Sequence, residues 1–266
     1  MFYLSLFKTY FAMRVKRLMT FKGSFIIQFF AQGLNYAATF LLMYVMITAF
    51  GNLNDWTSYE VMLLYALSLL SYGFAGMFFY FFRVYTAKEI LDGSFDDALV
   101  KPIHTLPYLI FKTLTPAYVI HISLAIAVLV FCVVKLKIII TLFMLTWIFV
   151  IILCGIFIYG GMFLFITAPT FVMMQTDSLG SMLFFLRESG YYPISIFPKV
   201  IQIIMTFILP YSMMNFFPIQ IILNKHDYVG FGAAMPWLAP LFAIVFFGLG
   251  IVCFVSLAKR YKSSGS

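Results

Sequence analysis

Long apolar stretches without any formal charge dominate this chain of 266 residues. Six of them contain no Asp, Glu, Lys or Arg: Ser24–Phe50, Val61–Phe82, Thr113–Val134, Ile138–Gln175, Val200–Asn224 and Tyr228–Ala258. A helix of about 20 apolar residues crosses the hydrocarbon of a bilayer, and a charge at the bilayer centre costs about 3 kcal/mol or more. The pattern therefore predicts an all-α membrane protein with six transmembrane helices. It also predicts an interior without formal charge, so that any driving energy comes from outside the membrane body.

Composition indicates one membrane domain. Only 10% of the residues are charged, which is too few to cover the surface of a soluble domain of this length. The longest polar connection, residues 83–112, is too short to form a separate globular domain. We therefore expect residues 1–262 to form a single transmembrane domain, and we exclude Ser263–Ser266, which resembles an appended linker.

The net charge of +8 is distributed unevenly. Most basic residues precede the first span, follow the last, or lie in the even-numbered connections: Lys8, Arg14, Lys16, Arg17, Lys22, Arg83, Lys88, Lys101, Lys112, Arg187, Lys199, Lys259, Arg260 and Lys262. Lys135, Lys137 and Lys225 fall on the other side. Because cytoplasmic loops carry an excess of Lys and Arg, we expect a multi-pass plasma-membrane protein with both termini in the cytoplasm. Its basic residues would contact anionic membrane lipids and not nucleic acid.

Two cytoplasmic segments have their own patterns. Residues 1–22 interleave aromatic with basic side chains, which predicts an interfacial helix. In the connection 83–112, capping-box patterns at Thr86–Glu89 and Ser94–Asp97 indicate two helix starts, with Gly93 ending the first helix and Pro102 the second. This connection is either a solvated linker or a docking surface, since apolar groups beside acids often mark a protein contact.

The fourth apolar run, Ile138–Gln175, is too long for one straight crossing. We expect a crossing to about Phe165, followed by an interfacial or broken helix. By its charges, Ser178–Lys199 is then a connection on the inside. Pro193 and Pro198 predict a rigid, non-helical entry to span five.

Polar side chains recur at helical spacing on three predicted spans. They are Gln28, Gln32, Asn35 and Thr39 on the first, Tyr65, Ser68 and Tyr72 on the second, and Gln202, Thr206 and Tyr211 on the fifth. Such faces should point into the protein. Two interpretations remain open: interhelical hydrogen bonds, which contribute about 0.6 kcal/mol each on average, or the lining of a translocation path.

The sequence predicts no catalytic residues and no metal site. The cysteines lie in spans without ligand spacing: Cys132, Cys154 and Cys253. His121 has no carboxylate in its span to exchange protons with. The acids Asp92, Asp96 and Asp97 could attract a hard cation but lack the partners of a lipid phosphotransferase. No GxxxxGK[ST] loop is present, so this chain is not expected to bind a nucleotide or another cofactor itself.

Two sequence patterns, at Ile90–Pro102 and Tyr192–Pro218, resemble in this order those of type-2 ATP-binding-cassette (ABC) exporter permeases. Residues Ile90–Pro102 match the pattern I-x-x-G-x-x-D-x-x-L-x-x-P of the loop after span two. Tyr192–Pro198, followed by Leu209-Pro210 and Asn215–Pro218, matches a second characteristic pattern. The basic N-terminal helix, the six spans and the chain length also fit the subfamily whose ATPase is a separate chain.

The resemblance implies an exporter half without an ATPase of its own. Two permeases, identical or homologous, would pair around a central path, and partner ABC ATPase subunits would bind ATP and Mg²⁺. The connection after span two would be the coupling helix that docks into the ATPase, marked by Gly93, Asp96, Asp97, Leu99, Lys101 and Pro102. With an uncharged path, the expected cargo is an amphipathic or apolar compound, such as a drug, lipid or peptide.

Alternatives remain at two points. In type-2 permeases generally, an element resembling Tyr192–Pro198 lies outside, between the last two spans, whereas the charges here place it inside. For function, an ion-coupled secondary transporter and a membrane-embedded lipid-modifying enzyme are the other two classes. The first would need carboxylates near the midplane or unwound helices at an ion site, and the second would use the Asp92–Asp97 cluster.

Overall fold

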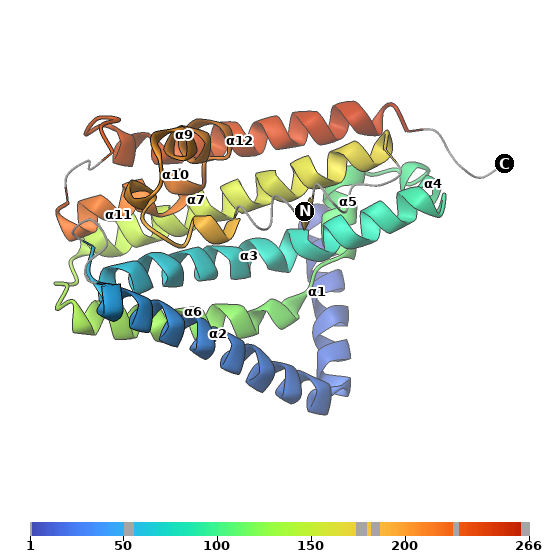
Figure 1. The fold of residues 1–266 in the computed structure, drawn as a ribbon. Helices are drawn as coiled ribbons and strands as arrows, with labels where there is room; N and C mark the ends of the chain where they lie inside the picture. The colour runs from blue at the N-terminus through green and yellow to red at the C-terminus, as the bar shows by residue number, and fades with distance from the viewer. Residues whose placement is uncertain (1, 51–55, 174–179, 182–186, 226–228, 262–266) are drawn as a thin grey trace.

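The computed structural model describes residues 2–50, 56–173, 180–181, 187–225 and 229–261. In this part of the chain all assigned elements are helices, and none is a strand (Figure 1). Five helices are long and apolar enough to cross a membrane: α2 (Lys22–Phe50), α3 (Ser58–Leu91), α6 (Val119–Lys135, preceded by the 3₁₀ turn η1, Pro116–Tyr118), α7 (Leu142–Thr167, extended by the 3₁₀ turn η2, Ala168–Phe171) and α12 (Met235–Ala258). A bent helix pair raises this number to six if it is counted as one span. The predicted all-helical, multi-spanning fold is confirmed.

The remaining described elements are α1 and several short helices and turns. They are α1 (Phe2–Thr20), α4 (Asp96–Leu99), α5 (Thr105–Lys112), η3 (Ile194–Ile196), α9 (Lys199–Ile203), the π-helical turn η4 (Ile204–Ile208), α10 (Tyr211–Met214) and α11 (Phe216–Leu223). In Figure 1, α1 runs across the long helices and not along them, as an interfacial helix would. We call the end of the bundle that carries α4 and α5 the α4 end, and the opposite end, where α11 meets the start of α3, the α11 end.

Helix α3 forms the centre of the bundle. Every side chain from Val61 to Ser71 is buried, because α3 packs against both α6 and α7, and α7 in turn packs against α12. A helix that is apolar on all sides is stable only in such a surrounded position or in lipid. The start of α3 is fixed by a capping interaction in which the Thr57 amide donates to the Glu60 carboxylate at 2.7 Å.

The predicted helix start at Thr86–Glu89 is wrong. Helix α3 continues through both residues to Leu91, where Gly93 with φ of +74° follows its end as predicted. Thr86 is buried inside the helix, and the Glu89 carboxylate pairs with the Lys112 ammonium at 2.6 Å. Tertiary contacts therefore override the capping pattern. Span two is one long helix that continues past the end of its apolar run at Phe82.

The predicted crossing at Val200–Asn224 is not one straight helix but the bent pair α9–η4 and α10–α11, and the contacts at its two ends favour a re-entrant hairpin. The second half is bent by 64° away from the direction of the first. At one end Lys199 Nζ donates to the Val229 carbonyl just before α12, and at the other Lys225 pairs with Glu60 at 3.0 Å. Both ends of the pair therefore lie at the α11 end. An α7 side chain holds the outgoing half, since Trp147 Nε1 donates to the Pro218 carbonyl at 2.8 Å.

The hairpin bends at Leu209-Pro210, where Pro210 cannot donate a helix hydrogen bond. Backbone groups freed inside a membrane protein need internal partners. Here the Ser212 hydroxyl donates to the Met205 carbonyl at 2.8 Å and shares a 3.0 Å hydrogen bond with Thr206. The predicted non-helical entry is confirmed in part, because η3 and two non-helical prolines precede α9.

The described residues between η2 and the hairpin pass from one end of the bundle to the other, so the prediction that Ser178–Lys199 is a connection at one end is wrong. Phe171 lies at the α4 end, 5.1 Å from the ring of Phe95. Gly180 lies against the Arg83 guanidinium. Gly190 has reached the other end of α3, since Asn215 Nδ2 donates to both the Gly190 and the Leu64 carbonyls. The Tyr192–Pro198 element therefore lies at the α11 end, opposite to the basic α4 end.

Helices α7 and α12 approach closely through glycine. A Cβ atom added to Gly250 would lie 3.1 Å from both Cα and O of Gly161, whereas one added to Gly248 would meet nothing within 4 Å. Small residues of this kind let membrane helices pack backbone against backbone.

Replacement of Gly250 by leucine should separate α7 from α12. Overpacking of this kind costs about 1–3 kcal/mol, so we expect Gly250→Leu to lower the thermal unfolding midpoint in detergent. Gly248→Leu makes the same change in the same helix and should leave the midpoint nearly unchanged. Equal midpoints for the two variants would show that the glycine contact is not tight.

Candidate functional site

A small surface at the tip of the α4 end is the first candidate site. Leu99 is 47% exposed and Val100 81% exposed, and Asp97, Lys101 and Pro102 are exposed beside them. Asp96 is half-buried, and Gly93 makes the left-handed turn that leads into α4. Five of the six predicted coupling residues thus lie in α4 or just after it, and Gly93 shapes its entry. We call Asp97 and Leu99–Pro102 the tip surface.

The tip surface is fixed to the membrane body by one buried aromatic side chain. Phe95 is fully buried, with its ring 5.1 Å from Phe171 after α7 and 5.0 Å from Tyr261 after α12. Ala98, one turn later, is also buried. Two faces of one short helix therefore differ sharply: the buried face contacts the ends of α7 and α12, and the opposite face is exposed.

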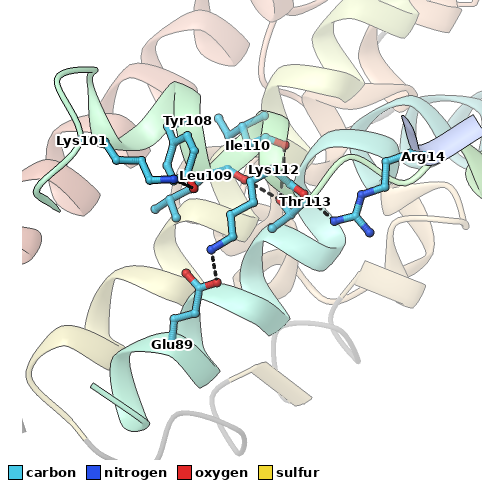
Figure 2. Close-up of polar contacts among 8 residues, drawn as sticks. All are labelled: Arg14, Glu89, Lys101, Tyr108, Leu109, Ile110, Lys112 and Thr113. Carbon is cyan, nitrogen blue, oxygen red and sulfur yellow. Dashed lines mark hydrogen bonds and ion pairs between the residues drawn. The ribbon is translucent and has the colours of Figure 1, made fainter. Parts of the chain in front are cut away.

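Polar contacts tie α5 to α1 and α3 beside this surface (Figure 2). Lys112 bridges to Glu89 of α3 by the ion pair at 2.6 Å, and its carbonyl accepts from the Arg14 guanidinium of α1. Lys101 donates to the Tyr108 hydroxyl at 2.6 Å, and this hydrogen bond raises the pKa of Lys101. The loop after α4 is thereby held against α5.

The residues predicted to line a translocation path do not gather on one common surface. Gln28 and Asn35 are exposed on α2, Gln32, Thr39 and Tyr72 are half-buried, and Tyr65, Ser68, Gln202 and Thr206 are buried. Ser68 and the Tyr159 hydroxyl share a 2.8 Å hydrogen bond between α3 and α7. Gln202 donates to the Phe197 carbonyl at 2.8 Å within the hairpin. For these buried residues, the observed bonds favour the hydrogen-bonding interpretation.

Arg187 is a functional candidate that the sequence pattern did not indicate. Its guanidinium carbon lies 4.4 Å from the ring centre of Tyr72 and 5.6 Å from that of Tyr191. Tyr72 lies midway along α3 between Glu60 and Arg83, about 16–18 Å from each at 1.5 Å per residue. The expectation of a membrane interior without formal charge is therefore wrong, because a short segment between two apolar runs carries Arg187 to mid-depth.

Aromatic and polar groups surround Arg187. The Tyr72 ring lies 5.5 Å from Tyr159 and 6.0 Å from His121, and Tyr191 lies 4.7 Å from Tyr65. Cation–π contacts are worth about 0.5–2 kcal/mol each and stabilise a cation that has left water. We call Arg187 with these five side chains the arginine–tyrosine cluster.

The cysteines and the acidic residues around α4 were the candidates for metal binding. Among the described residues, no three His, Cys, Asp or Glu side chains gather in a way that could hold a metal ion. The three cysteines are free thiols within α6, α7 and α12. Asp92 precedes the Gly93 turn at the tip of the bundle and Asp96 and Asp97 follow it, with Asp97 on the exposed tip surface.

These features define a multi-pass helical membrane protein whose exposed tip surface is anchored by the buried Phe95. The chain belongs to the ABC-2 transporter family, because the family model described as ABC-2 family transporter protein matches residues 34–265. It is thus the membrane component of an ABC transporter, a type of chain that is typically a non-catalytic permease subunit with ATPase partners. A search of curated proteins gave no match, and a search of solved structures gave none.

Removal of the Phe95 ring should loosen α4 without disturbing the spans. Phe→Ala in a packed core costs about 3–5 kcal/mol. We expect Phe95→Ala to raise hydrogen exchange in residues 92–102 while exchange in α3 residues 61–71 stays slow. Leu99→Ala, on the exposed face of the same helix, is the control. Unchanged protection of residues 92–102 in Phe95→Ala would contradict the anchoring role.

Proposed function

We propose that this chain is the permease subunit of an ATP-driven exporter, and that a partner ABC ATPase docks on the tip surface. The observation that carries the proposal is the two-sided α4: an exposed face of Asp97, Leu99 and Val100 backed by the buried Phe95. Exposed apolar groups with a charged rim are typical of protein contacts. A rigid backing lets force on this face reach α7 and α12 through the contacts of Phe95.

The charge distribution supports a cytoplasmic α4 end. Described basic residues at this end are Lys8, Arg14, Lys16, Arg17, Lys22, Arg83, Lys88, Lys101, Lys112, Lys259 and Arg260. Those at the α11 end are Lys135, Lys137, Lys199 and Lys225. This excess of Lys and Arg favours the cytoplasmic side, where an ATPase has access to ATP. We therefore infer a plasma-membrane protein with both termini in the cytoplasm.

A second permease, identical or homologous, would complete the path. Helix α2 is our candidate for the pairing surface because it is the least buried of the candidate spans in the described residues, with Ile27 72% and Leu34 73% accessible. The proposed cargo is an amphipathic compound whose polar part contacts the arginine–tyrosine cluster. A charged side chain at mid-depth in a membrane protein is usually retained for function.

Charge placed on the tip surface should uncouple the ATPase. A buried charge at a docking centre costs about 2 kcal/mol or more, so we expect Val100→Glu to weaken ATPase binding at least tenfold. Co-purification of the partner ATPase in mild detergent and ATP turnover of the complex measure this effect. Ile139→Glu introduces the same charge at an equally exposed position, 81% accessible, at the α11 end, and should bind the ATPase normally.

Two outcomes would count against the docking proposal. Normal ATPase recovery with Val100→Glu would place the contact elsewhere on the chain. Equal losses for Val100→Glu and Ile139→Glu would indicate a general folding defect, which the thermal midpoint of each variant would reveal.

Substitution of Arg187 should alter which compounds stimulate ATP turnover. Charge-assisted contacts contribute about 1.5–3 kcal/mol, so Arg187→Gln should raise the half-maximal concentration of acidic amphiphiles about tenfold or more. Neutral amphiphiles should change little, and Arg187→Lys should retain part of the response. Arg260→Gln, at the exposed end of α12, is the control. An unchanged stimulation profile in Arg187→Gln would show that Arg187 packs against the tyrosines but does not contact the cargo.

A further inference from the structure

Two cavities flank α1 where it meets α2, at the α4 end of the bundle. The first has a volume of about 230 Å³ and lies between the α1–α2 junction and the segment Leu114–Ala117. The second has a volume of about 580 Å³ and lies on the neighbouring side of α1. Leu18, Phe25 and Pro116 line both cavities, so the two share a wall.

The first cavity is basic. Arg14 and Arg17 line it together with polar groups of Ser24, Gln28 and Thr115, and no Asp or Glu is among its lining residues. Arg14 is held in place because one of its N–H groups donates to the Lys112 carbonyl (Figure 2). A guanidinium carries five N–H donors, so further donors of Arg14 remain for a ligand. Two guanidinium groups in one cavity favour a phosphate, which each can bind in bidentate geometry.

The second cavity is apolar. Val15 and Met19 of α1, Ile26 of α2, Met77 of α3 and Val119 of α6 contribute to its walls. Lys22 is the one charged residue among the lining residues of this cavity. A volume of this size beside membrane helices suits a hydrocarbon chain, which makes van der Waals contacts with such apolar walls.

We propose that the two cavities together bind one anionic phospholipid, with its phosphate between Arg14 and Arg17 and an acyl chain along Val15, Met77 and Val119. The occupant is a lipid and not a free phosphate because the apolar cavity adjoins the basic one. Such a lipid would bridge α1, α2 and α6, helices whose direct contacts with one another are few. The inference does not depend on the proposed export function.

Lipid binding to the purified chain, measured by native mass spectrometry, tests the headgroup part. With equal amounts of phosphatidylglycerol and phosphatidylcholine, we expect retention of phosphatidylglycerol at one site. Arg17→Gln should reduce this retention about tenfold, and Arg14→Gln/Arg17→Gln should abolish it. Arg260→Gln removes an exposed arginine at the same end of the bundle, outside both cavities, and should retain the lipid normally. Equal losses in Arg17→Gln and Arg260→Gln would overturn the proposal, because they would indicate general charge attraction.

A second pair of variants tests the acyl-chain part. Val119→Trp should fill the apolar cavity and reduce phosphatidylglycerol retention, whereas Val130→Trp, at an exposed position of the same helix outside the cavity, should not. Retention unaffected by Val119→Trp, or displacement of the lipid by millimolar inorganic phosphate, would overturn the lipid assignment in favour of a free anion. The thermal midpoint of each variant confirms that Arg14→Gln/Arg17→Gln and Val119→Trp remain folded.

Discussion

The continuous burial of α3 is the constraint on which the rest of the structure depends. This helix contacts α6 on one side and α7 on another, and its side chains from Val61 to Ser71 are buried throughout. Because no break interrupts it before Leu91, α3 connects the Glu60–Lys225 ion pair at one end directly to the Gly93 turn at the other. A rigid central helix of 34 residues can carry a displacement along its whole length, whereas a helix broken at Thr86 would absorb it.

Hydropathy predicted the long helices because backbone groups in lipid must bond internally and charges there are costly. The same rule misassigned the return crossing. Arg187 and Glu188 made residues 178–199 resemble a polar connection, and the apolar content of Val200–Asn224 made the hairpin resemble a span. Composition does not report tertiary contacts. The stacking of Arg187 on Tyr72 stabilises the return crossing, and the hydrogen bond of Ser212 to Met205 stabilises the bend of the hairpin.

Predictions at the candidate sites differed in quality for a similar reason. The short helix at the tip could be predicted because Gly93 and Pro102 limit it by local backbone geometry, whereas its role in coupling rests on the resemblance and stays a proposal. The path residues depended on which helix faces which, and that is decided by tertiary packing. Ser68 was placed correctly on a protein-facing side of α3, yet its partner Tyr159 comes from a helix 91 residues away.

The close approach of α7 and α12 gives these sites a mechanical connection. At Gly161 and Gly250 the backbones of the two helices pack directly against each other. Both helices are followed by residues that contact the Phe95 ring, Phe171 after α7 and Tyr261 after α12. A push on α4 would therefore move α7 and α12 as one body. Tyr159, next to Gly160 and Gly161, touches the Tyr72 ring that carries Arg187, so the same movement would change the space around that arginine. The proposed coupling between the tip surface and mid-depth would need no hinge within α3, but only a shift of the α7–α12 pair against it.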